Sequence, residues 1–589
     1  MEMSPRTTEE YLRARRRRRK RNSRLLLIIV ILCAIAAAII GWFVINRYFI
    51  ESKERMSPDK YFNNENLKFS TAELKDNEAM IIVNGEQKKS EAIIQDGIGY
   101  LALDFVSENF NSRFYPDKET NGVIYTNGKG TAVFYAGSKE YTDNSGEKVT
   151  AERAPIVSMN GKFYIDSSFL AKYTKMTAVT STAPNRVSIN YGTSGWKTAE
   201  ARSDTRVRYY AGIKSMIVTD IKKGENVQVL GNESGWTKVF TPNGYIGYVK
   251  ESSLNETGTA DIKTADEDTF THRALEGKVS LAWLQVSNKY ANANAEKLTE
   301  GVSDLDIVAP TWYSFADNVG TINDFSSAEV VNSLHSKGYK VWPVVNDFTS
   351  DVDIEVILSS KTMRSRMITR LMEDAKYMKY DGINVDFETI KEGASDDFLQ
   401  FIRELSVECR KNGIMLSVDD YPPRRYNAHY DMGEQAAYAD YIVLMNYDEH
   451  YAGSEEIGSV SSIGFVNTNL DLALKYVSSD RLINALPLYT RVWGTNAEGK
   501  RVSSDTAAMT TSEDLVKNNN GSKVWDEKTG QNIASYSKDG IDYKIWMEDA
   551  RSLQLKIDAG RSRNIAGIAF WRLGYDTADV WRLVSSYKN

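Results

Sequence analysis

The chain has 589 residues, with 73 Lys and Arg against 79 Asp and Glu, and a net charge of −6. At about 100 to 200 residues per domain, this length predicts three or four folded units rather than one core. Apolar residues make up 42% of the chain, an ordinary share for globular protein. The acidic balance argues against nucleic acid or other polyanions as partners.

The N-terminus combines a basic tail with a long apolar run. Residues 1–24 hold ten Lys or Arg against three Glu, and the 21 residues from Leu25 to Ile45 carry no charge. Such a run is long enough to cross a bilayer core of about 30 Å as a helix. The alternative, a cleaved signal peptide, has a shorter apolar run that ends at small residues, whereas Ala34 to Ala38 lie inside this one. We therefore expect an uncleaved single-pass anchor in the cell membrane, with a cytoplasmic tail and with residues 46–589 outside.

The numbers and positions of cysteines and histidines limit which disulfides and metal sites can be expected. Cys33 lies in the apolar run and Cys409 far from it, so no internal disulfide is expected. A large exported protein without disulfides fits a bacterial surface, and we expect a Gram-positive bacterium. No metal-ligand spacing links the histidines to carboxylates or cysteines, so neither a metal nor a cofactor is predicted. The four histidines are His272, His335, His429 and His450.

Residues 46–78 are polar and charged, which favours a stalk. Residues 79–190 contain a repeat at an offset of 64, in which Tyr100 and Phe105 correspond to Tyr164 and Phe169. Each copy predicts a hairpin strand, a short helix and another strand, and so an α+β repeat domain. With its opening Ile-Ile-Val-Asn-Gly at residues 81–85, the segment resembles the copper amine oxidase N-terminal-like domain. It contains no His or Cys, so no copper is expected, and the implied role is that of a spacer or wall-contacting module.

Residues 201–254 carry short alternating strands with turn signals, which predict a small all-β barrel. Gly235-Trp236 and Gly247-Tyr248-Val249 give the segment a resemblance to bacterial SH3-like domains, a family that often binds peptidoglycan peptides. The alternative is that Trp236 only fills a small core. Residues 255–273, rich in Thr, Asp and Glu, are expected to form a linker.

Residues 274–589 alternate apolar strands with helical patterns, as a (β/α)8 barrel requires. A long segment at about residues 494–561, before the last strand, contains hairpin-like stretches. The eight expected strands are residues 279–286, 306–312, 340–345, 382–388, 414–418, 441–447, 482–488 and 565–571.

The fourth of these strands carries an acidic row behind a glycine. Side chains alternate along a strand, so Asn384, Asp386 and Glu388 point to one face. The α-carbons of Asp386 and Glu388 should lie roughly 6.6 Å apart, so one sugar unit could touch both carboxylates. Because burying unpaired carboxylates is expensive, the row indicates a catalytic cleft. The alternative is an edge strand with a solvated acidic face.

The same stretch resembles the signature of family 18 glycoside hydrolases, Asp-Gly-x-Asp-x-Asp-x-Glu. Asp381, Gly382, Asp386 and Glu388 match it, while Asn384 replaces the middle Asp, a departure that resembles the spore-cortex and cell-wall-lytic branch. An amide cannot share a proton with Asp386, so we expect Asp386 to stay ionised and to accept a hydrogen bond from Asn384.

The resemblance implies an α+β insertion at residues 494–561 that walls the cleft. It also implies substrate-assisted hydrolysis, in which Glu388 is the acid, Asp386 steers the 2-acetamido group and Tyr447 donates to its oxygen. Aromatic and polar side chains at strand ends suit the binding of a glycan. The substrate contacts that we expect are Asp381, Asn384, Trp312, Tyr313, Met445, Asp448 and Trp571.

The implied partner is a polysaccharide containing β-linked N-acetylglucosamine. The anchor and the SH3-like segment favour peptidoglycan, with chitin or another glycan as the alternative. Some family 18 barrels are lectins that have lost the acid, so a non-catalytic glycan-binding protein or wall tether is a further alternative. Retention of Glu388, Asp386 and Tyr447 favours an enzyme.

Overall fold

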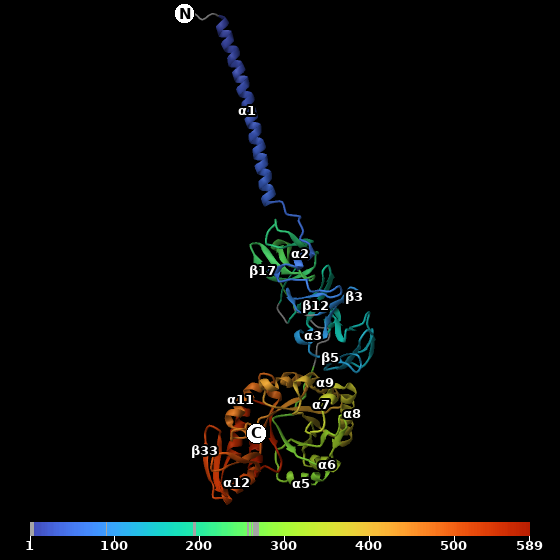
Figure 1. The fold of residues 1–589 in the computed structure, drawn as a ribbon, viewed down its shortest axis with the longest axis vertical. Coiled ribbons are helices and arrows are strands. Elements are labelled where there is room, and N and C mark those ends of the chain that lie inside the picture. Colours follow the sequence, from blue (N-terminus) through green and yellow to red (C-terminus); the bar gives the residue numbers. More distant parts are fainter. Residues whose placement is uncertain are drawn as a thin grey trace. The chain divides into compact units, whose positions relative to one another are not determined.

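The computed structural model describes residues 5–89, 91–192, 196–255, 258–260, 262 and 270–588. The chain divides into two compact units (Figure 1). The front unit comprises residues 1–105 and 164–266, and the barrel unit comprises residues 106–163 and 267–589. The chain therefore passes from one unit to the other three times, after residues 105, 163 and 266.

The front unit begins with helix α1, Pro5–Tyr48, a single 44-residue helix (Figure 1). Residues 8–48 are long and apolar enough to cross a membrane. The large apolar side chains from Leu25 to Ile45 are exposed rather than packed against protein. The helix therefore has the length and surface of a membrane span or of a signal sequence.

The repeat in the front unit forms two equivalent strand–helix pairs. Strand β4 (Ile98–Ala102) leads into helix α3 (Leu103–Asn109), and strand β11 (Lys162–Asp166) leads into helix α4 (Ser167–Leu170). The two strands pair with each other in antiparallel register, Tyr164 opposite Ala102. The segment closes where its first strand, β1 (Met80–Val83), pairs in parallel with its last, β13 (Asn185–Tyr191).

A seven-stranded sheet completes the front unit, in the order β16-β15-β19-β18-β17-β14-β20. Its apolar core includes Val207, Val218 and Val249. Trp236 lies outside this core and is half-exposed. The strands are β14 (Trp196–Glu200), β15 (Thr205–Arg208), β16 (Ile217–Ile221), β17 (Asn226–Glu233), β18 (Trp236–Phe240), β19 (Ile246–Lys250) and β20 (Gly258–Ala260).

Residues 56–69 pack against this sheet rather than forming the expected stalk. Tyr61 and Phe62, in the short helix α2 (Pro58–Phe62), are fully buried in the same core. The Tyr61 hydroxyl donates to the Ile246 carbonyl at 2.7 Å and accepts from the Ile246 amide at 2.7 Å. This segment is therefore part of a folded core.

The barrel unit contains the predicted closed ring of eight parallel strands. Each strand pairs with the next, and the last pairs with the first. The third strand is interrupted at Trp342-Pro343 and consists of two short pieces. The ring is formed by β21 (Val279–Leu284), β22 (Ile307–Pro310), β25 (Lys340–Val341) with β26 (Val344–Asn346), β27 (Gly382–Asp386), β28 (Met415–Asp420), β29 (Tyr441–Met445), β30 (Leu482–Pro487) and β36 (Gly567–Trp571).

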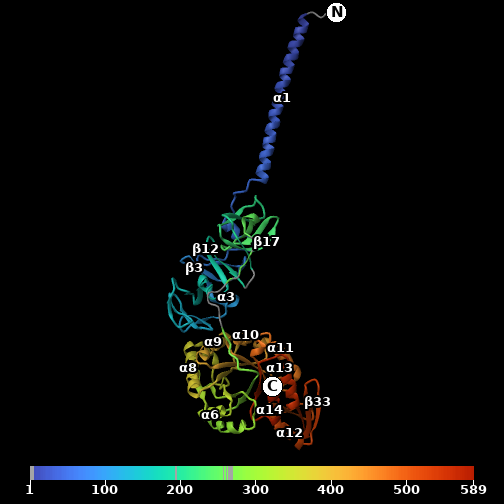
Figure 2. The ribbon, with the colours of Figure 1, turned by 180° about the vertical axis from the view of Figure 1, so that it is seen from behind.

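Helices surround the ring (Figure 2), and the larger apolar core of the unit lies between strands and helices. A second, smaller core fills the interior of the ring. The fold-class prediction is confirmed, because alternating strands and helices do form a barrel. The main helices are α6 (Ala328–Ser336), α8 (Lys361–Met378), α9 (Ser395–Lys411), α10 (Met432–Tyr438), α11 (Ile463–Ala473), α13 (Ala550–Ser562) and α14 (Ala578–Lys588).

Between β30 and β36 the chain forms the predicted α+β insertion, a five-stranded sheet in the order β32-β31-β35-β34-β33 with one helix. Its first strand directly follows Leu488, so the insertion starts at the carboxyl end of the barrel. Its elements are β31 (Tyr489–Thr495), β32 (Arg501–Ala508), α12 (Met509–Asn518), β33 (Ser522–Asp526), β34 (Gln531–Lys538) and β35 (Ile541–Met547).

A second antiparallel sheet, in the order β5-β6-β7-β8-β9, comes from residues 106–163 and packs on the barrel helices. Gln400 of α9 donates to the Thr126 hydroxyl at 3.0 Å, and the Tyr438 hydroxyl donates to the Thr126 carbonyl at 3.0 Å. Arg113 pairs with Glu434 at 3.1 Å. The sheet consists of β5 (Phe114–Asp117), β6 (Gly122–Asn127), β7 (Gly130–Tyr135), β8 (Glu140–Thr142) and β9 (Lys148–Thr150), and β10 (Ile156–Met159) follows it.

Candidate active site

The acidic row lies on the inner face of β27, at the carboxyl end of the barrel. Asn384 is paired with Ser417 of β28, and Asp386 with Asn346 of β26. Both side chains are buried, while Glu388, just beyond the strand, is only partly buried. Active sites of such barrels lie at this end, where loops after several strands converge.

Gly382 fits this strand because it has no side chain. A Cβ atom there would lie 2.6 Å from Cδ1 of the buried Trp342 indole on strand three. Any larger residue would have to displace that ring, and a packed core does not accommodate such a shift cheaply. The glycine of the motif therefore preserves the packing beneath the acidic row.

Glu388 is held from two sides. The Tyr421 hydroxyl donates to its Oε2, and its backbone amide donates to Oδ1 of Asp347 at 2.8 Å. Burial raises the pKa of Glu388, and the charges of Asp347 and Asp448 raise it further, while the bond from Tyr421 opposes them. The carboxyl group of Glu388 is thus favoured in its protonated form, as a general acid requires.

Asp386 and Tyr447 share this environment. Burial raises the pKa of Asp386 well above its usual value, with further contributions from Asp419, Glu388 and Asp347. Burial likewise raises the pKa of the Tyr447 phenol, followed by the charges of Asp386 and Glu388. The structure therefore brings together the three residues predicted for catalysis.

Asn384 differs from its predicted role. Its amide nitrogen donates to Asp419 at 2.7 Å and to Ser417 at 2.9 Å, and its oxygen accepts from the Trp283 indole at 3.0 Å. It therefore does not support Asp386, whose raised pKa also opposes ionisation. The expected hydrogen bond is wrong, because the amide faces the neighbouring strand rather than the next carboxyl group of its own strand.

Three other predicted contacts lie around the acids. Trp571, at the end of β36, is half-buried, and its ring centre lies 5.7 Å from that of the Trp283 indole. Met445 is buried at the end of β29, and Asp448 accepts a hydrogen bond from the Tyr489 hydroxyl. Tyr489 comes from the insertion, which therefore contributes to this end of the barrel.

Trp312, Tyr313 and Asp381 lie elsewhere. Trp312 and Tyr313 are fully buried in the core between strands and helices, where the Trp312 indole donates to Asn292 at 2.9 Å. Asp381 precedes β27 at its amino end and accepts from the Val341 amide at 2.9 Å. The structure thus gives these three residues packing or strand-joining roles in place of the expected substrate contacts.

Asp419 is a site residue that the sequence reading missed. It lies on the inner face of β28, is 2% exposed and accepts the hydrogen bond from Asn384. The predicted strand ended at Val418, one residue too early to include it. The alternation of Ser417 and Asp419 across one face was the available signal.

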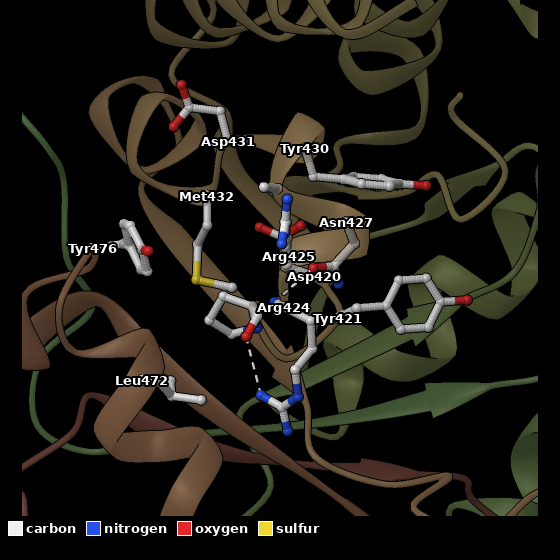
Figure 3. Close-up of a pocket in the computed structure, with 12 residues that line it drawn as sticks. Asp420, Tyr421, Arg424, Arg425, Asn427, Tyr430, Asp431, Met432, Leu472 and Tyr476 are labelled. Atoms are coloured by element: carbon white, nitrogen blue, oxygen red, sulfur yellow. Dashed lines mark hydrogen bonds between the residues drawn. The ribbon is translucent and has the colours of Figure 1, made fainter. Parts of the chain in front are cut away.

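A cavity of about 280 Å³ lies beside Tyr421, outside the ring. In Figure 3, Met432, Leu472 and Tyr476 lie along one side of the residues drawn, and Tyr421 and Tyr430 along the other. The cavity shares Tyr421 with the site but contains neither Asp386 nor Glu388. It is therefore separate from the acidic row.

The family models match three parts of the chain. The model of glycosyl hydrolases family 18 matches residues 279–576, about half of the chain. The chain belongs to this family. The bacterial SH3 domain matches residues 203–255 and the copper amine oxidase N-terminal domain matches residues 70–189, which confirms both resemblances. The protein is therefore a family 18 glycosidase with two additional modules.

Curated relatives match about half of the chain. The uncharacterized glycosylase YvbX of Bacillus subtilis is 26% identical over 305 residues, which cover 50% of this chain and 87% of that protein. A cortical fragment-lytic enzyme of Bacillus anthracis is 23% identical over 333 residues, 53% of this chain and 75% of that protein. Among solved structures, the Bacillus cereus spore cortex-lytic enzyme SleL matches with a TM-score of 0.49 and 19% identity, over 64% of this chain and 79% of SleL.

Proposed function

We propose that this family 18 glycosidase is anchored in the cell membrane and hydrolyses β-linked N-acetylglucosamine glycans, peptidoglycan above all, by substrate assistance with retention of configuration. The observation that carries the proposal is the grouping of Glu388, Asp386 and Tyr447 at the carboxyl end of the barrel. A protonated acid beside a second carboxyl and a phenol is the set that this reaction needs.

In the first step Glu388 donates its proton to the glycosidic oxygen as that bond breaks. Burial favours the protonated form of its carboxyl group, and the Tyr421 hydroxyl holds one of its oxygens. The leaving sugar departs as an alcohol, and Glu388 remains as a carboxylate. That carboxylate then takes a proton from the water that completes hydrolysis.

The nucleophile is the substrate's own 2-acetamido oxygen, which attacks the anomeric carbon and is later displaced by water. Asp386 accepts a hydrogen bond from the acetamido nitrogen and stabilises the positive charge that develops there. The Tyr447 hydroxyl donates to the acetamido oxygen, while Trp571 supplies an apolar floor for the sugar ring. Two inversions at one carbon give a β-configured product.

The support for the proposed location and substrate comes from the segments that precede the barrel in the chain. The basic residues in the first half of α1, before its apolar run from Leu25, favour a cytoplasmic N-terminus by the positive-inside rule, which leaves the barrel outside. In the SH3 domain, half-exposed Trp236 borders a cavity of about 250 Å³ with Arg206 and Asp204, a surface suited to a charged peptide.

The decisive experiment compares the full chain in detergent with its Glu388→Gln variant on purified peptidoglycan and on chitin oligosaccharides. We expect reducing ends to appear with the wild type, a β-anomer as first product by NMR, and a loss of about 10² to 10⁴ in turnover for Glu388→Gln with glycan binding retained. Glu392→Gln, an exposed carboxyl four residues later, is the matched control. An α-anomer, or a fully active Glu388→Gln, would overturn the mechanism; hydrolysis of chitin alone would overturn the substrate.

A further inference from the structure

Two carboxyl groups meet across neighbouring strands of the barrel. Val385 of β27 is paired with Val418 of β28, so the next residues, Asp386 and Asp419, are also neighbours. Asn384 and Ser417, two residues earlier on the same faces, are paired as well. Because side chains alternate along a strand, both carboxyl groups enter the barrel interior side by side.

Each of these carboxyl groups has one oxygen without a hydrogen-bond partner among the residues that the structure describes. Asp386 and Asp419 are 4% and 2% exposed, and the unpaired atoms are Oδ1 of Asp386 and Oδ2 of Asp419. Two buried carboxylates side by side repel each other, and each would leave an unsatisfied acceptor. One proton held between Oδ1 of Asp386 and Oδ2 of Asp419 removes the repulsion and gives both oxygens a hydrogen bond, as in the paired carboxyl groups of aspartic proteases.

The surrounding groups favour this arrangement. The Asn384 amide occupies Oδ1 of Asp419, and the Trp283 indole fixes the other end of that amide. Asp419 is therefore held with its Oδ2 available for the proton. The charged groups acting on the pair are themselves acidic, namely Glu388, Asp347 and Asp420, and they also disfavour a second negative charge.

We propose that Asp419 is a positioning residue that supplies, from the fifth strand, the second carboxyl group that Asn384 no longer provides on the fourth. This role rests on the proposed substrate-assisted reaction. Before substrate binds, one proton is shared between Asp386 and Asp419. When the acetamido N–H arrives, the proton passes to Asp419, and Asp386 becomes the carboxylate that accepts from that N–H and stabilises its developing positive charge. When product leaves, the proton is shared again, so no charge is gained or lost.

This arrangement accounts for an amide rather than a carboxyl group at position 384. An aspartate at 384 beside Asp419 would place a third carboxyl group in contact with the pair, whereas the Asn384 amide donates to it. Conversely, removing the Asp419 carboxyl alone leaves Asp386 without a proton partner. Restoring a carboxyl at 384 should then compensate.

The test uses Asp419→Ala, Asp419→Asn and the double variant Asn384→Asp/Asp419→Ala in the full chain. We expect Asp419→Ala to lose at least about 10² in kcat with KM changed less than about threefold, since the lost stabilisation acts mainly in the transition state. Asparagine can present its N–H to Asp386 as a protonated Asp419 does, so Asp419→Asn should retain activity within about tenfold of wild type. The double variant should recover at least about tenfold over Asp419→Ala.

Wild-type kcat in Asp419→Ala, or a double variant no more active than a folded Asp419→Ala, would overturn the proposal. Tryptophan fluorescence and glycan binding establish folding of each variant. If instead the wild type forms no β-anomer, or if Glu388→Gln equals it, the proposed function fails and not this inference. The two failures are therefore distinguishable.

Discussion

Asp420, the residue after the paired carboxyl group of β28, gives the sharpest test of the structure's electrostatics. Its side chain faces the helices and is 2% exposed, and Oδ1 accepts from Nε2 of Gln435 at 3.1 Å. Within the described part of the chain, its Oδ2 and the Gln435 oxygen both have no hydrogen-bond partner. Burial raises the pKa of Asp420 to about 8, against the opposing bond from Gln435. A proton on Oδ2 provides the donor that the Gln435 oxygen lacks.

The sign of the effect follows from this raised pKa. Asp420 loses its proton near pH 8 in the folded state, but near its usual pKa of about 3.9 in the unfolded chain. Its contribution to the free energy of unfolding is therefore fully present below pH 4 and is lost as pH rises through 8. Within that window one group contributes about 1.4 kcal/mol per pH unit, or about 2.7 kcal/mol between pH 5 and pH 7. Asp420→Asn cannot titrate, yet it keeps an acceptor for Gln435 and adds a donor. The wild type should therefore lose about 2.7 kcal/mol more than Asp420→Asn over this interval.

The assay is urea unfolding of the full chain in detergent at pH 5 and pH 7, followed by tryptophan fluorescence. Eight of the eleven tryptophans lie in residues 267–589, so the signal reports mainly the barrel unit. Glu527→Gln, which removes an exposed carboxyl group, is the matched control and should follow the wild type. Equal losses in the wild type and Asp420→Asn would refute the reasoning, because Asp420 would then not titrate in this interval.

Three further predictions concern Tyr421, a buried ion pair between Arg364 and Glu404 in the barrel unit, and helix α1. Tyr421→Phe removes the bond that lowers the pKa of Glu388, so the alkaline limb of kcat/KM should move to higher pH; an unchanged profile would contradict this. Arg364→Ala leaves its partner Glu404 unpaired in a buried site, so urea unfolding should show a loss of about 3 to 5 kcal/mol. Removing residues 1–48 should move the protein from the membrane fraction to the soluble fraction, and retention in membranes would contradict the anchor.

The barrel was predictable from sequence because its signals are local. Each strand is a short apolar run between helical patterns, and all eight expected strands are present in the structure. Asp386 and Glu388 were found because strand alternation places acids on one face without knowledge of the partner strands. The convergence of strand ends placed Tyr447 at the same rim of the barrel, and the resemblance to family 18 supplied its role.

The predictions that failed concern residues whose role depends on contacts with parts of the chain that are distant in sequence. Trp312 follows β22, but its amide bonds back to the Pro310 carbonyl at 2.9 Å, and the ring enters the core instead of the cleft. Tyr61 and Phe62 stand among polar residues, and only the sheet formed some 150 residues later buries them. Asp381 shares the motif with Glu388 but lies at the opposite end of the strand, a distinction of direction that alternation alone does not make.

The three passages of the chain between the two units have a consequence for release of the enzyme. Residues 106–163 remain in the barrel unit through contacts such as Gln400 with Thr126, while both of their ends continue into the front unit. A single proteolytic cut between residues 255 and 270 would therefore not shed the hydrolase from its anchor. Release of a free barrel fragment would require cuts near 105 and 163 as well, so this order of segments would keep the barrel joined to the proposed anchor after a single cut.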